Sequence, residues 1–327
     1  MSPVLRVTAD ADPEPTPAGV PQRVSLGLAE LVVAARLAGD VPLPVRTAEH
    51  LATGDRMTDR LAGTPQNEAR ELVDRELRRA DDDGPDGGRA ALATQGLLDD
   101  TGALEKGVTV ALQTLAGGPL SVVLDVSAVR RAGEVRLRSW FGVRPGLVAQ
   151  LTTGSSLDFE LAWFDPRLWV SQVTRAVTVE PWVPEPAPLT LPDYVSLPSE
   201  LLAGSEKAHR DHRTELLAPM AASYLGEVRM GEPREVRAAD SEEALALLHT
   251  LGGACRGRLR LLTTRRDLPD NPAVSAWLLF DDGWHELRPG RGATSVLRHR
   301  DARDVGLFTL PLIEAVRDEP VRDEGGV

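Results

Sequence analysis

The spacing of apolar and polar positions predicts a helix followed by four strands and a second helix. Between Leu104 and Gly118, apolar residues fall on one helical face, and a Gly-Gly pair provides the stop that a helix end favours. Four extended runs follow, with the sequences LSVVLDVSAV, EVRLRSWFGV, GLVAQLTT and SLDFELAWF. Asp165 and Pro166 then have the residue types expected at an N-cap and at the first position of a helix.

The same order of residues recurs after an offset of 136 positions. One register holds across a helix, several strands and the start of a second helix, which favours an internal duplication over coincidence between two ordinary α+β segments. The pairs of identical residues are Leu112 and Leu248, Thr114 and Thr250, Leu115 and Leu251, Gly117 and Gly253, Ser139 and Ser275, Leu151 and Leu287, Gly154 and Gly290, and Asp165 and Asp301.

These patterns predict an α+β fold with a central, largely antiparallel sheet built from two helix–four-strand–helix halves. Prolines are frequent before the first half, and six prolines lie between 181 and 198, where they predict an extended connector. The predicted organisation is a flexible lead (1–23), a first half (24–180), a proline-rich connector (181–200), a second half (201–317) and a disordered tail (318–327).

Composition limits the classes of function. Of the 327 residues, 42% are hydrophobic and 26% are charged, which is typical of a soluble globular protein, and no stretch is long and apolar enough for a membrane helix. The N-terminus shows no secretory signal, and Cys255 is the single cysteine, so we expect a cytoplasmic protein in a reducing compartment. The net charge of −12 argues against a nucleic-acid partner.

Two surfaces are candidates for binding another protein. In the strand EVRLRSWFGVR, the period of two places Arg136, Arg138 and Trp140 on one face, which is either a solvated face or one that meets a partner. The last predicted helix, about 301–317, carries Phe308 and Leu312 at helical spacing, where they are either core or contact residues.

The pattern of histidine, cysteine and serine residues does not predict catalysis. His209 and His212 are three residues apart, but no further metal ligand accompanies them, and no serine or cysteine lies in a nucleophile-elbow context. We therefore predict a binding protein that is not an enzyme, with no catalytic residues, no metal and no cofactor.

Several segments share a pattern with a known family: LATQGLLDDTGAL (92–104), VALQTLAGGPLSVVLDV (110–126), the arginine-bearing strand, and GRLRLL…VSAWLLFDDGWHELRPG before a final helix. Over roughly residues 24–317, the chain resembles the EspG family, the cytosolic chaperones of actinobacterial type VII (ESX) secretion systems. The resemblance implies a central sheet with quasi-two-fold halves. It also implies a PE/PPE-like client, whose apolar helical tip the chaperone binds, keeps soluble and helps to direct to export.

Two other classes of function stay open at the level of sequence. An enzyme or small-ligand binder could use a cleft between the two halves, since duplicated sheets create such clefts. A structural component of a larger assembly would oligomerise constitutively. The contact residues proposed for a client are Arg136, Arg138, Trp140, Phe308 and Leu312, and they come from the strand and helix patterns alone.

Overall fold

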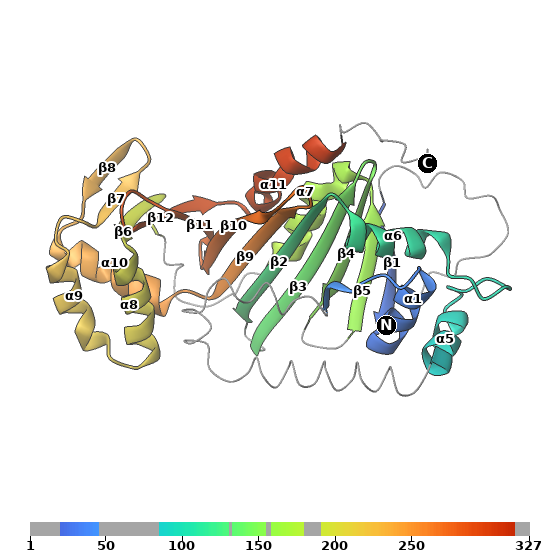
Figure 1. Cartoon of the computed structure of the whole chain (residues 1–327). Coiled ribbons are helices and arrows are strands. Elements are labelled where there is room, and N and C mark those ends of the chain that lie inside the picture. Colours follow the sequence, from blue (N-terminus) through green and yellow to red (C-terminus); the bar gives the residue numbers. More distant parts are fainter. Residues whose placement is uncertain (1–19, 46–84, 131–132, 155–157, 180–190, 318–327) are drawn as a thin grey trace.

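The computed structural model describes residues 20–45, 85–130, 133–154, 158–179 and 191–317, and a continuous antiparallel sheet forms their centre. Its twelve strands are β1 (Gln22–Gly27), β2 (Leu120–Arg130), β3 (Gly133–Arg144), β4 (Leu147–Thr153), β5 (Asp158–Phe164), β6 (Tyr194–Pro198), β7 (Arg229–Glu232), β8 (Glu235–Ala238), β9 (Gly257–Arg265), β10 (Leu268–Phe280), β11 (Gly283–Pro289) and β12 (Thr294–Arg300). Their order across the sheet is β1-β5-β4-β3-β2-β9-β10-β11-β12-β6-β7-β8 (Figure 1). The predicted α+β class with an antiparallel sheet is confirmed.

Strands β2 and β9 form the seam between the two halves of the sheet. They pair antiparallel from Leu120 opposite Arg265 to Ala128 opposite Gly257. Gly257 is needed for this close approach, because a Cβ at this position would lie 2.6 Å from the carbonyl oxygen of Ser127. Outward from the seam, the order β2-β3-β4-β5-β1 on one side corresponds to β9-β10-β11-β12-β6 on the other, and the β7–β8 hairpin extends the second side.

The bounds of the elements follow the offset seen in the sequence. Shifted by 136, β4 and β5 coincide with β11 and β12, and β2 and β3 coincide with β9 and β10 to within a residue or so at each end. The helices that precede and follow each set of four strands also correspond. The agreement concerns the order and length of the elements, and the internal duplication with quasi-two-fold symmetry stays a prediction.

Helices cover both faces of the sheet. One face is covered in the first half by α1 (Leu28–Leu37) and α6 (Lys106–Gly117), with α5 (Pro85–Thr94) packed on α1, and in the second half by α8 (Ser199–Arg210), α9 (Leu217–Ser223) and α10 (Ser241–Gly253). The opposite face is covered by α7 (Trp169–Val177) and α11 (Ala302–Arg317), which pack against each other. Each layer buries its own cluster of aliphatic and aromatic side chains.

Local sequence signals start these helices. Asp240 accepts hydrogen bonds from the backbone N–H groups of Glu242 and Glu243, and the Glu243 carboxylate accepts one from the Asp240 N–H, which forms a capping box at α10. Asp165 accepts from the Arg167 N–H at 2.8 Å and starts the short 3-10 turn that leads into α7. The helix start predicted at Asp165 and Pro166 is therefore present as a 3-10 turn.

Two predicted domain bounds differ from the structure. Strand β1 begins at Gln22, inside the predicted lead, and β6 and the first residues of α8 lie inside the predicted connector. Val195 and Leu197 of β6 are fully buried, and Pro198 ends that strand, so the proline-rich stretch still supplies a strand to the sheet. Residues 1–19 of the lead, residues 181–190 of the connector, and the predicted tail lie outside the described residues.

Candidate protein-binding surfaces

The residues proposed as client contacts lie on opposite faces of the sheet. Arg136, Arg138 and Trp140 belong to the face of β3 that α6 and α1 cover at one end, whereas the neighbouring Phe141 faces α7, with its ring centroid 4.9 Å from that of Trp169. Phe308 and Leu312 lie on α11, which packs on the α7 side. One compact helical tip therefore cannot contact both groups at once.

Trp140 is buried, so the prediction that it lies on an open sheet face is wrong. Its exposed fraction is 4%, and it belongs to the core cluster that includes Leu112 of α6 and Leu151 of β4. The cause is tertiary: α6 lies so close to β3 that a Cβ at Gly142 would be 2.2 Å from the Thr114 carbonyl oxygen. The Arg138 guanidinium lies 5.9 Å from the centroid of the Trp140 ring, within the range of a cation–π contact at the edge of the covered area.

Four arginines meet at the seam on this same side of the sheet; we call Arg136, Arg138, Arg258 and Arg260 the arginine face. On β2, Asp125 lies between Arg138 of β3 and Arg260 of β9. The next residue on that side, Ser127, lies between Arg136 and Arg258. Strand β2 lies between β3 and β9, which are therefore two strand spacings apart, or about 10 Å. The backbone positions of the four arginines thus lie close together.

Two carboxylates contact the arginine face. Arg138 forms an ion pair with Asp125, and Arg258 forms one with Glu206 of α8. The side chains of Arg138 and Arg258 still keep 45% and 48% of their surface exposed. Exposed arginine side chains of this kind offer charged hydrogen-bond donors to an acidic or polar partner surface.

None of the described helices covers the middle of this face. In Figure 1, no described helix lies over β2, β3 and β9 between α6 on one side and the α8–α10 group on the other. Apolar side chains accompany the arginines there: Val129 and Val274 are each 53% exposed, and Val123 is half-buried. The surface thus combines apolar contact area with cationic hydrogen-bond donors, a composition enriched in protein interfaces.

A hollow of about 460 Å³ adjoins the arginine face where the two halves meet. It is lined by Ser127, Ala128, Val129, Glu206, His209, Arg210, Gly252, Gly253, Cys255, Arg256, Gly257 and Arg258. Burial raises the pKa of the Cys255 thiol, which disfavours the reactive thiolate. Within the described part of the chain, no three histidine, cysteine or carboxylate residues group as a metal site would require.

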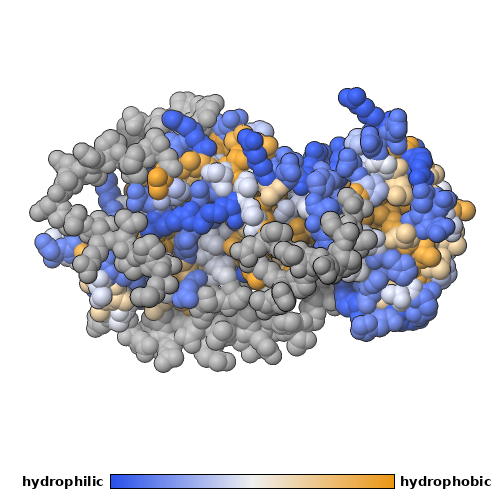
Figure 2. Space-filling model, turned by 180° about the vertical axis from the view of Figure 1, so that it is seen from behind, coloured by the Kyte–Doolittle hydropathy of each residue, from blue (hydrophilic) through white to orange (hydrophobic). Residues whose placement is uncertain are grey.

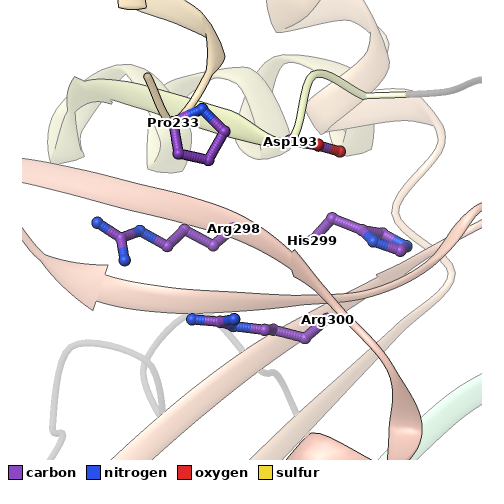
Figure 3. Close-up of a pocket in the computed structure, with 5 residues that line it drawn as sticks. All are labelled: Asp193, Pro233, Arg298, His299 and Arg300. Carbon is purple, nitrogen blue, oxygen red and sulfur yellow. The ribbon is translucent and has the colours of Figure 1, made fainter. Parts of the chain in front are cut away.

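A second, smaller hollow of about 170 Å³ lies between the end of β12 and the β7–β8 turn. Its lining residues are Asp193, Pro233, Arg298, His299 and Arg300 (Figure 3). Arg298 and Arg300 extend to one side of β12 and His299 to the other, so the three polar groups do not converge on one point. This arrangement does not form a ligand site.

The outer face of α11 exposes apolar side chains. Leu307 and Phe308 are 38% and 41% exposed, Pro311 is exposed, and Leu312 is half-buried against the core between α11 and α7. Figure 2, which shows the molecule from behind, has hydrophobic side chains along the upper edge, where Figure 1 places α11. The helix pattern left open whether Phe308 and Leu312 are core or contact residues; in the structure Phe308 is exposed and Leu312 is half-buried, and their role as contacts stays a prediction.

Arg258 and Arg260 were not among the residues proposed from the sequence. Their signal is present in GRLRLL, where arginines alternate with leucines at the period of a strand. The importance of that alternation depends on the pairing of β9 with β2, which brings these arginines beside Arg136 and Arg138 from more than a hundred residues away.

Known proteins match this chain in structure but not in sequence. No family model and no curated protein match the sequence. The chain is similar in structure to the type VII secretion system chaperone EspG5 of Mycobacterium tuberculosis, solved in complex with a PE25–PPE41 dimer. The superposition has a TM-score of 0.49 and 12% sequence identity, and it covers 92% of this chain and 98% of that one. No helix in the described ranges is long and apolar enough to cross a membrane.

Proposed function

We propose that this chain is a non-enzymatic cytoplasmic chaperone that binds the apolar helical tip of a PE/PPE-like type VII secretion substrate. It keeps that client soluble and helps to direct it to export. The observation that supports the proposal is the arginine face with its exposed valines, which none of the described helices covers between α6 and the α8–α10 group. The resemblance of the sequence to the EspG family gives the class of client.

The composition of the arginine face suits a client that has to be protected and later released. An apolar helical tip would otherwise self-associate, and Val129 and Val274 offer it apolar contact area. The exposed parts of the Arg138 and Arg258 side chains offer hydrogen-bond donors around that area, and arginine is among the residues that contribute most to binding energy at interfaces. An interface of standard size, about 1,600 Å², would hold the client without making the complex permanent.

Between the two proposed surfaces, we assign the client to the arginine face. A tip bound there would lie between α6 and the α8–α10 group and contact both halves of the sheet. The stripe on α11 belongs to a single helix on the outside of the molecule. In this assignment Trp140 does not contact the client. It is buried in the core, where its ring lies against the Arg138 guanidinium and helps to position it.

Co-expression with candidate helical clients, followed by size-exclusion chromatography, tests the proposal. We expect a client that is insoluble alone to elute in a complex with this chain. The double substitution Arg138→Glu with Arg260→Glu should weaken that complex by at least about tenfold, because it reverses two charges beside Asp125. Arg167→Glu, in the turn before α7 on the opposite side of the sheet, is the matched control and should leave the complex intact.

The same experiment can refute the proposal. If every helical client stays insoluble while this chain elutes alone, the chaperone function is wrong. If a complex forms but the double substitution at the arginine face does not weaken it, the client binds elsewhere, and the assigned surface is wrong.

The hollow at the junction of the halves supports one alternative, a small-ligand binding protein. Its volume of about 460 Å³ lies in the range of ligand pockets. A thermal-shift screen with anionic metabolites tests this alternative. It would be favoured if one compound raised the Tm of the wild type but not that of Arg210→Gln, because Arg210 lines the hollow.

A further inference from the structure

The exposed side of α11 carries an apolar stripe that has opposite charges at its two ends. Leu307, Phe308 and Pro311 form its centre, and each is exposed. Arg303 lies before this centre and Glu314 after it, and both side chains are exposed. The side of α11 that faces the sheet carries the buried residues Val305, Ile313 and Val316, so the exposed stripe is separate from the core.

The two charges are placed symmetrically about the apolar centre. Eleven residues separate Arg303 from Glu314, which is about three helical turns, so the two side chains project from nearly the same side of the helix, about 16 Å apart. The midpoint between them falls between Phe308 and Thr309. A two-fold axis through that midpoint would place Arg303 of one helix opposite Glu314 of an antiparallel copy, twice, with the two Phe308 rings near the axis.

We propose that α11 is the interface through which two copies of this chain associate as an antiparallel, two-fold symmetric dimer. A two-fold interface requires a self-complementary surface, and the stripe meets that requirement in both its apolar centre and its charged ends. The occupant is therefore a second copy of the same chain. The inference does not depend on the proposed chaperone function, because it concerns the free protein.

The size of the stripe predicts a weak dimer. Three turns of one helix cannot bury the roughly 1,200 Å² at which specific, stable interfaces begin, so association should be concentration-dependent. The arginine face lies on the opposite side of the sheet and stays free in such a dimer. A dimer could thus present two separate client surfaces.

Sedimentation-velocity centrifugation of the full chain alone, from micromolar to millimolar concentration, tests the proposal. We expect a reversible monomer–dimer equilibrium. Phe308→Glu should weaken it by at least about tenfold, because it places two carboxylates near the axis. Arg167→Glu, whose side chain is 75% exposed at the start of the neighbouring turn, is the matched control and should leave the equilibrium unchanged.

Charge reversal makes the test specific for the antiparallel arrangement. Arg303→Glu alone and Glu314→Arg alone should each weaken self-association, because like charges then meet twice. An equimolar mixture of these two variants should associate as well as the wild type, since each reversed residue then meets its opposite charge in the other chain. The double variant should also self-associate like the wild type.

Two results would overturn the proposal. The first is a chain that stays monomeric up to millimolar concentration. The second is self-association that Phe308→Glu and the single charge reversals leave unchanged. If the chain is monomeric and Phe308→Glu instead abolishes client capture in the co-expression assay, the stripe is a client surface and the dimer is wrong.

Discussion

At the scale of single residues, Trp169 connects the two halves on the side of the sheet covered by α7 and α11. Its indole N–H lies 3.0 Å from both the Gly306 carbonyl oxygen and the Thr309 hydroxyl oxygen of α11, and the ring is fully buried. We predict that Trp169→Ala lowers the free energy of unfolding by about 3 to 5 kcal/mol. Trp169→Phe should cost less, since it keeps most of the packing. Urea unfolding checks the order, and equal losses would contradict it.

His209 is the residue whose protonation we expect to affect the packing of α8 on α10. Its ring lies against Gly252 and Gly253, where a Cβ would come within 2.4 Å of the imidazole. Burial, and to a smaller extent the nearby His249, lower the pKa of His209 below its ordinary 6.5. The neutral form is therefore favoured in the folded state. This contribution to stability is present above pH 6.5 and is lost as the pH falls below 6.5 towards the lower folded pKa.

An NMR titration of the histidine side chains measures this effect directly. The midpoint of His209 should lie below 6.5 in the folded protein, and His249→Ala should raise it by removing the neighbouring positive charge. A midpoint at or above 6.5 would show that neither burial nor His249 acts on His209 as the structure indicates.

At the scale of elements, the contact between α6 and β3 decides which part of the sheet is covered. Gly142 permits it, since any side chain there would collide with the Thr114 carbonyl oxygen and the Leu115 Cα of α6. We predict that Gly142→Ala destabilises the protein by about 1 to 3 kcal/mol and exposes Trp140 to solvent. Thermal melts and the tryptophan emission maximum check this. Gly87→Ala, at a position with open space around it, is the control; an equal effect there would contradict the prediction.

At the scale of the whole molecule, the seam should make the two halves unfold together. Strands β2 and β9 pair along nine residues each, and α7 packs on α11 across the same boundary. Tryptophans lie in both halves, at Trp169 and Trp284 among others. We predict that far-UV circular dichroism and tryptophan fluorescence give coincident urea transitions. Two separated transitions would show instead that each half is stable alone.

Much of the fold could be predicted from the sequence because the signals are local. The four strands from 120 to 164 follow from extended runs separated by turns, and the start of α10 follows from Asp240 and Glu243. These patterns act within a few residues of the elements they specify, so they can be read without knowing what the elements contact.

The candidate surface could not be predicted in the same way. The period of a strand correctly separates Arg138 and Trp140 from Phe141, but it cannot tell whether a helix covers that face. The structure shows that α6 covers Trp140 and leaves Arg138 exposed. The second pair of arginines, Arg258 and Arg260, joins the surface only through strand pairing over a long sequence distance.

The sequence by itself determined the class of fold, the order and bounds of most elements, and the faces on which side chains lie, because these depend on period and on capping residues close in the chain. The tertiary structure alone decided which faces are covered, that Arg136 and Phe308 lie on opposite sides of the sheet, and that four arginines meet at the seam. Burial and proximity depend on how distant segments pack, and in this chain the decisive contacts are those of β2 with β9 and of α6 with β3.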